Sequence, residues 1–124
     1  MYNDGLLGLV AEVDIPPRRA VVLTSGGKVT LAANGDSPII GITADTATDA
    51  GGVCDFYPSG CGVIVEAVTG ATVNPGQALT AGAGGKLVPA PAGKFVCALA
   101  VTGASGADYR IRVIPVGYYS PASP

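Results

Sequence analysis

The chain has 124 residues, with seven Lys and Arg against nine Asp and Glu, so its formal net charge is −2. Its basic residues are spread from Arg18 to Arg112, with no cluster beyond Arg18-Arg19, which argues against binding to phosphate backbones. The absence of His and of any C-x-x-C pair among three Cys argues against zinc, a disulfide framework and His-dependent catalysis. We therefore expect no enzyme, no cofactor, no metal and no nucleic-acid partner.

Glycine and proline dominate the composition, with 19 Gly and 10 Pro beside a 48% hydrophobic share. So many turn-favouring residues in a chain of single-domain length predict many short elements. No apolar stretch is long enough to span a bilayer, and the first residues lack the basic start of a secretory signal. We expect a soluble protein without a membrane partner, made in the cytoplasm, whose three thiols are buried and free.

Short runs rich in Val, Ile and Leu recur along the chain, each bounded by Gly, Pro, Asn or Asp. They cover residues 6–13, 20–24, 28–32, 38–44, 53–57, 61–69, 77–80, 86–90, 95–101 and 109–116. This spacing is typical of strands in a β-barrel or sandwich, and no stretch has a capped helical period. The sequence predicts an all-β fold, a small barrel or sandwich.

Three turns can be assigned from residue types. Gly26-Gly27 and Asn34-Gly35 accept the positive φ of tight turns, and each follows a strand-like run. Pro58-Ser59-Gly60 separates the runs 53–57 and 61–69. All three are predicted to close β-hairpins.

The two halves of the chain resemble each other. Segment 23–35 is similar to segment 79–93, and the matched positions are 58 or 57 residues apart: Lys28 with Lys86, Gly35 with Gly93, residues 40–43 with 97–100, and Pro58 with Pro115. Two copies are too few for a solenoid. We expect two similar β-units whose apolar faces close on each other with approximate twofold character.

The predicted organisation is a single domain over residues 1–124. It begins with an N-terminal segment or arm, 1–19, continues with a first β-unit, 20–69, and a second β-unit, 70–117, and ends in a flexible Pro-rich tail, 118–124. The N- and C-terminal segments are expected to be extended, because Pro16-Pro17 and the tail prolines cannot join a central strand.

The residues at 32–43, 73–80, 85–88 and 97–100 give the chain a family resemblance, which spans Ala20 to Val116. The chain resembles small bacteriophage head proteins of the capsid decoration, or cement, type, which often carry the label of predicted phage recombinases. The resemblance implies a β-rich homotrimer on the capsid exterior of the virion, between subunits of the major capsid protein, which strengthens the shell. The three Cys and the Tyr-Ser-Pro tail depart from the pattern, and no P-loop or basic surface supports a recombinase.

Candidate capsid or intersubunit contacts lie near both ends of the chain. The apolar residues Leu6, Leu7, Leu9 and Val10 could add a strand to the sheet edge of a neighbour, or could equally form an internal strand. Arg18 and Arg19 are further candidates. Tyr118 and Tyr119 could anchor an interface, because tyrosine combines apolar area with a polar tip.

Two other classes of function stay open. One is a tail, fibre or surface module of the virion that recognises a glycan or receptor. The other is an enzyme or carrier domain, which would need a modified Lys86 or an acidic site at Asp45 and Asp49. Neither position has the flanking pattern of a known modification or calcium site.

Overall fold

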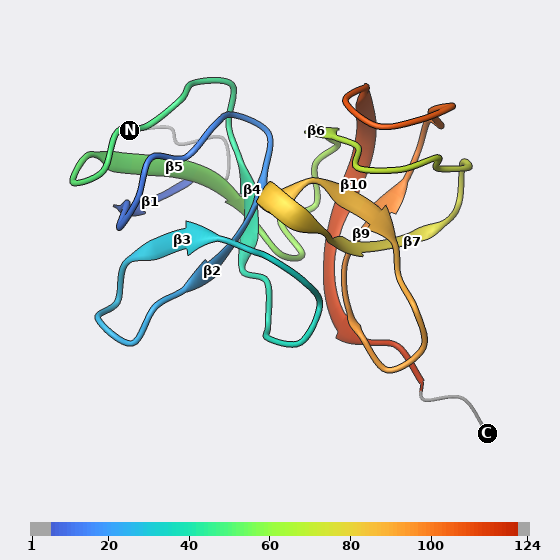
Figure 1. Cartoon of the computed structure of the whole chain (residues 1–124), viewed down its shortest axis with the longest axis horizontal. Coiled ribbons are helices and arrows are strands. Elements are labelled where there is room, and N and C mark those ends of the chain that lie inside the picture. Colours follow the sequence, from blue (N-terminus) through green and yellow to red (C-terminus); the bar gives the residue numbers. More distant parts are fainter. Residues whose placement is uncertain (1–5, 122–124) are drawn as a thin grey trace.

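Ten strands form two five-stranded antiparallel sheets in the computed structural model, which describes residues 6–121 (Figure 1). The first sheet has the order β1-β5-β4-β2-β3, with β1 (Leu7–Val10), β2 (Ala20–Leu23), β3 (Val29–Leu31), β4 (Gly41–Thr43) and β5 (Val53–Pro58). The second has the order β6-β10-β9-β7-β8, with β6 (Val65–Val68), β7 (Ala78–Ala81), β8 (Leu87–Pro89), β9 (Phe95–Ala100) and β10 (Arg110–Tyr119). A short 3-10 turn, η1 (Ala83–Gly85), precedes β8. The predicted all-β fold is confirmed.

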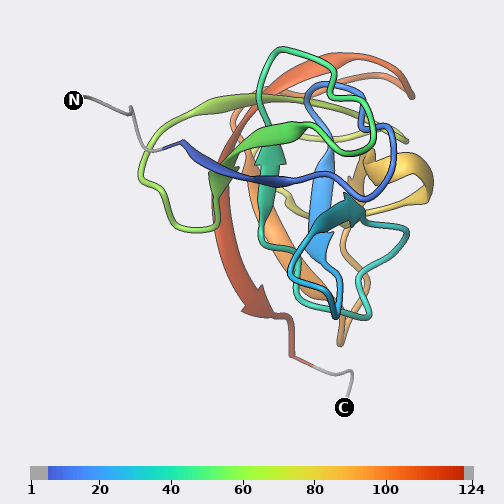
Figure 2. The same cartoon turned by 90° about the vertical axis from the view of Figure 1, so that its left-hand side faces the viewer.

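Each sheet curls until its two edges meet. A parallel bridge between Ala11 and Val29 joins the end of β1 to β3, and a bridge between Thr69 and Leu87 joins the end of β6 to β8. We call the two closed units barrel 1 and barrel 2. They form the two lobes of Figure 1, and Figure 2 shows the molecule with barrel 1 toward the viewer.

The strand register confirms the internal repeat. Both sheets have the same strand order once five is added to each strand number of the first sheet. Cross-strand pairs of the first sheet also recur in the second, 58 positions later for residues in β1 to β3 and 57 positions later for residues in β4 and β5. Examples are Val21–Leu31 with Leu79–Pro89, and Gly41–Pro58 with Ala98–Pro115. Every strand position of barrel 1 therefore has a counterpart in barrel 2.

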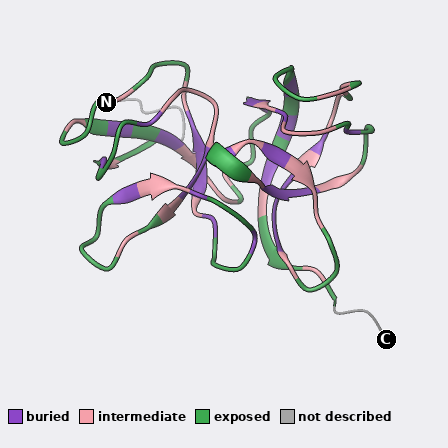
Figure 3. Cartoon of the chain, viewed as in Figure 1, coloured by how far each residue is buried: buried purple, intermediate pink, exposed green. Residues whose placement is uncertain are grey.

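Two clusters of buried apolar side chains form the core of the molecule. The smaller one fills barrel 1 and contains Ala11, Ile15, Val21, Val29, Cys54 and Phe56. The larger one fills barrel 2 and continues into barrel 1 through Ala20, Ala32, Ile39 and Ile42. Buried stretches accordingly run along the strands where the two lobes of Figure 3 meet. Because one cluster spans both units, apolar burial couples the barrels.

The division between the units differs from the expected one. Residues 7–10, expected in an N-terminal segment, form β1 of the first sheet, and residues 65–68, expected to end the first unit, form β6 of the second. The expected twofold relation is not found either. Arg18 of barrel 1 contacts barrel 2, whereas a Cβ at its counterpart Gly76 would meet no atom within 4 Å among the described residues.

One of the three predicted hairpins is confirmed. Gly27, with φ of 78°, lies in the connection between the paired strands β2 and β3. The other two predictions are wrong, because the flanking strands do not pair with each other. The turn at Asn34-Gly35 joins β3 to β4, which both pair with β2, and Pro58-Ser59-Gly60 leads from β5 of barrel 1 to β6 of barrel 2.

Part of the expected flexible tail is fixed by hydrogen bonds. Tyr118 and Tyr119 belong to β10, the Ser120 N–H donates to the Lys94 carbonyl oxygen at 2.9 Å, and the Pro121 carbonyl oxygen accepts from the Gly93 N–H. The remaining tail residues, 122–124, and the first five residues of the N-terminal segment lie outside the described residues.

The cysteines are free, and two of them are buried as expected. Cys54 and Cys97 are each 1% exposed, whereas Cys61 is only half-buried. Burial raises the pKa of the Cys97 thiol to about 12 and also raises that of Cys54. Among residues 6–121, the structure has no helix long and apolar enough to cross a membrane.

Candidate binding surface

Arg18, a predicted contact residue, lies between the two barrels. Its Nη2 is 3.4 Å from Asp45 Oδ1 and its Nε is 3.3 Å from Glu66 Oε1, so it links barrel 1 to β6 of barrel 2. Its side chain is only 17% exposed. The backbone follows the same path, because the Arg18 carbonyl oxygen accepts from the Val68 N–H at 3.1 Å. Arg18 thus stabilises the contact within the chain.

Arg19 also takes part in the contact between the two barrels. Its Nη1 donates to the Gly84 carbonyl oxygen at 3.0 Å, across the junction between the barrels, and its own N–H donates to Thr43 Oγ1 at 2.8 Å. Its Nε is buried and has no hydrogen-bond partner among the described residues. Both arginines, predicted for capsid or intersubunit contacts, therefore contact their own chain.

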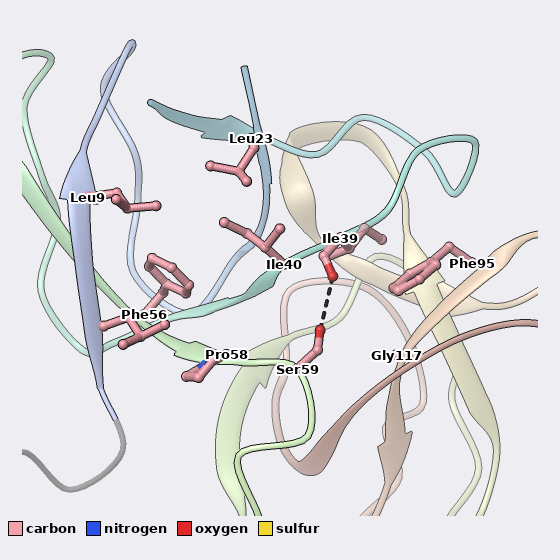
Figure 4. A pocket seen from close by; sticks show the side chains of 10 residues that line it. Leu9, Leu23, Ile39, Ile40, Phe56, Pro58, Ser59, Phe95 and Gly117 are labelled. Atoms are coloured by element: carbon pink, nitrogen blue, oxygen red, sulfur yellow. Dashed lines mark hydrogen bonds between the residues drawn. The ribbon is translucent and has the colours of Figure 1, made fainter. Parts of the chain in front are cut away.

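A cavity of about 450 Å³ opens on barrel 1, beside the junction (Figure 4). Its lining is mostly apolar and comes from β1, β2, β5 and the segment before β4, with a smaller part from barrel 2: Leu7, Leu9, Leu23, Ile39, Ile40, Phe56, Pro58, Ser59, Phe95 and Gly117. The hydroxyl of Ser59 donates to the Ile39 carbonyl oxygen at 3.0 Å. This lining favours apolar side chains over a polar substrate.

The apolar rim of this cavity is unusually open. The side chains of Leu7 and Leu23 are 50% and 52% exposed, although both residues lie in strands of a closed barrel. Leu9 is half-buried, and Phe56 at the floor is 1% exposed. Exposed apolar area around a hollow is typical of an interaction site.

Two of the four predicted N-terminal contacts lie at this cavity. Leu7 and Leu9 line the cavity, Val10 is 38% exposed at the end of β1, and Leu6 is half-buried just before it. Of the two alternatives for this segment, the internal strand is the one formed, with β1 paired to β5 at an edge of the first sheet. Sequence reasoning missed Leu23, Ile40 and Phe56, because no local pattern shows that the barrel brings them to Leu7.

Tyr118 and Tyr119 are the last two residues of β10 and directly follow Gly117, which lines the cavity. They are 45% and 51% exposed. The ring of Tyr119 packs edge-on against Phe95, with ring centroids 5.2 Å apart and an interplanar angle of 83°. Tyr118 pairs with Val96 in the sheet. The two tyrosines are thus held on a rigid strand with much of their surface free.

Lys86, considered above as a carrier site, forms an ion pair at the barrel surface. Its Nζ is 2.5 Å from Asp108 Oδ1. The hydrogen bond and charge of Lys86 lower the pKa of the Asp108 carboxyl. No cluster of three metal-binding side chains is found in residues 6–121.

Comparison with solved structures shows a likeness in fold. No protein-family model matches the chain, and no curated protein matches it. Among solved structures, the chain is similar to the head fiber gp8.5 N base in bacteriophage phi29, with a TM-score of 0.69 and 20% sequence identity. The match covers 89% of this chain and 92% of that chain. The two proteins therefore share a fold over most of both chains.

Proposed function

We propose that this chain is a structural protein of a bacteriophage virion that binds the outside of the capsid and stabilises the shell by bridging major capsid subunits. The observation that carries the proposal is the fold likeness to a phage head fiber base, which covers 92% of that chain. The sequence resemblance to head decoration proteins supports it independently. In this role the chain catalyses no reaction and needs no cofactor.

The proposed mechanism is avidity. A homotrimer presents three equal contact surfaces, so that separating two capsomers would require several moderate contacts to break together. The fold suits this task, because two barrels joined by one apolar cluster form a stiff body that can transmit force between its contacts.

Tyr118 and Tyr119 are the proposed capsid contacts. They are exposed, close together, and held on β10 by strand pairing and by the contact of Tyr119 with Phe95. Rigid aromatic side chains lose little conformational entropy on binding, and tyrosine is enriched at interfaces. Tyr118 is the cleaner residue to test, since Tyr119 also packs within the chain.

The test is cosedimentation of the purified chain with emptied, expanded heads of the phage that encodes it. We expect saturable binding, and about tenfold weaker binding for Tyr118→Ala. Tyr109→Ala is the matched control, because Tyr109 is 50% exposed elsewhere on barrel 2 and should not change binding. A wild-type chain that stays in the supernatant at all concentrations would overturn the proposed function.

A second candidate function is the base of a head fibre, which the printed name of the structural neighbour favours. Both candidates bind the head, but only a cement strengthens it. Heating DNA-filled heads with and without the bound chain distinguishes the two candidate functions. We expect the temperature of DNA release to rise with the bound chain, whereas a fibre base would leave it unchanged.

A further inference from the structure

The contact between the two barrels is made by an apolar row on the outer face of the first sheet. Ala20, Ile42 and Tyr57 lie side by side across β2, β4 and β5. Ala20 and Ile42 are fully buried, at 0% exposure, and Tyr57 is partly buried against the cluster of barrel 2. Together with Ala32 and Ile39 of the same cluster, this row belongs to the part of barrel 1 that barrel 2 covers.

The counterpart row on barrel 2 has the same chemistry but is uncovered. Ala78, Leu99 and Ile114 lie side by side across β7, β9 and β10, in the register of Ala20, Ile42 and Tyr57. Ala78 and Leu99 are only half-buried, and Ile114 is 38% exposed. One apolar row is thus buried by a neighbouring barrel, and its repeat is left open.

The receiving side shows the reverse pattern. On barrel 2, Val65, Ala67 and Ala81 belong to the same buried cluster as Ala20 and Ile42, and all three are at most 6% exposed. Their counterparts on barrel 1 are Leu7, Leu9 and Leu23, which line the cavity of Figure 4. The side chains of barrel 2 that share a cluster with the row are thus buried, whereas their counterparts on barrel 1 line an open cavity.

The ion pair of the contact within the chain has no charged counterpart on the open faces. Within the chain, Arg18 faces Glu66, and their counterparts on the open faces are Gly76 and Gly8. Arg18 and Gly76 both have positive φ, 62° and 83°, which agrees with their being counterparts. A contact between the open faces would therefore bury no unpaired charge at these two positions, so it avoids a large desolvation penalty.

The contact is head-to-tail, because two different faces meet. Such contacts build rings or open filaments, depending on the rotation between units. Asp36 and Lys94 are counterparts, 58 positions apart, and their side chains form an ion pair across the junction. Counterparts can touch only near the axis that relates the two barrels. The barrels are therefore related by rotation about a nearby axis, which favours a ring.

We propose that the row Ala78, Leu99 and Ile114 of one copy docks on the cavity lined by Leu7, Leu9 and Leu23 of a second copy. The contact within the chain is then repeated between chains, and three copies close a ring of six barrels. The number three rests on the homotrimer of the proposed function, whereas the choice of faces rests on the exposure of the repeated positions.

The test is the mass of the full chain by size-exclusion chromatography with light scattering. We expect three chains for the wild type, and one chain for both Ile114→Asp and Leu23→Asp, which place a charge on one open face each. Val13→Asp is the matched control, because Val13 is 40% exposed and belongs to neither face, and it should stay trimeric. Far-UV circular dichroism confirms that each variant is folded.

Mixing the two monomeric variants tests the head-to-tail arrangement itself. Ile114→Asp keeps an intact cavity and Leu23→Asp an intact row, so together they can form one contact and should give a two-chain complex. A trimeric single variant, a monomeric wild type, dissociation of Val13→Asp, or a mixture that stays monomeric would overturn the inference. The proposed function is tested separately, since head binding by the wild type does not depend on which faces join the copies.

Discussion

Gly41 is a residue whose small size decides the packing of barrel 1. A Cβ at this position would lie 2.4 Å from the Tyr57 carbonyl oxygen and 2.7 Å from Phe56 Cδ2. Its counterpart in barrel 2 is Ala98, and there the smaller Val113 replaces Phe56. In barrel 1 the glycine leaves room for the large Phe56 ring, whereas in barrel 2 an alanine is combined with the smaller Val113.

Replacing Gly41 by alanine should therefore destabilise the protein. We expect Gly41→Ala to lower the free energy of unfolding by about 1–3 kcal/mol, the usual cost of overpacking. Urea titration measures the loss. Gly26→Ala is the control, because a Cβ at Gly26 would lie 3.8 Å from its nearest neighbour, Thr24 Oγ1. This substitution should change the free energy of unfolding by no more than about 0.5 kcal/mol. Equal effects of the two substitutions would contradict the steric account.

Cys97 should make stability depend on pH in the alkaline range. Burial raises the pKa of its thiol from 9.0 to about 12, so above pH 9 the thiol ionises in the unfolded chain but not in the folded one. The contribution of the Cys97 thiol to the free energy of unfolding is complete below pH 9 and is lost as pH rises toward 12. Relative to Cys97→Ala, the wild type should lose about 1.4 kcal/mol of unfolding free energy between pH 8 and 10. Parallel pH profiles of the two proteins, measured by urea titration, would contradict this.

At the scale of elements, strands could be located from the sequence far better than their partners. The apolar runs and the Gly26-Gly27 hairpin are local features, and the structure contains them. Pro58-Ser59-Gly60 is an equally good local turn, with φ of 75° at Gly60, but the strands on its two sides belong to different sheets. Turn chemistry fixes the direction of a few residues, whereas burial across the whole fold selects the partner of each strand.

The two repeated rows provide a test of burial at the same scale. In a Leu23→Asp background, expected to be monomeric, Ile42→Ala should lower the free energy of unfolding by about 2–5 kcal/mol, because it leaves a cavity in the contact between barrels. Leu99→Ala, its half-buried counterpart, should cost about 1 kcal/mol. Equal losses in urea titrations would mean that a single chain already covers Leu99.

At the scale of the whole molecule, the duplication could be predicted, because Gly, Lys and Pro recur at separations that the strand register confirms. The packing of the two copies could not. Two similar units can meet through equal faces or through different ones, and the sequence repeat is the same in both cases. The outcome depends on side chains such as Arg18 and Glu66, which meet across the junction and whose counterparts are both glycine.

Assembly should then determine how tightly the chain holds a capsid. If three copies bind the shell together, loss of the ring removes the second and third contacts without changing the first, and apparent affinity should fall by about 10²–10⁴-fold. Ile114→Asp makes this separation, because it leaves unchanged the proposed capsid contacts Tyr118 and Tyr119, which lie further along β10. Cosedimentation of Ile114→Asp and Val13→Asp with expanded heads measures the difference. Unchanged binding by a monomeric Ile114→Asp would show that a single chain carries the whole affinity, and the shell would then gain its strength from each chain rather than from the ring.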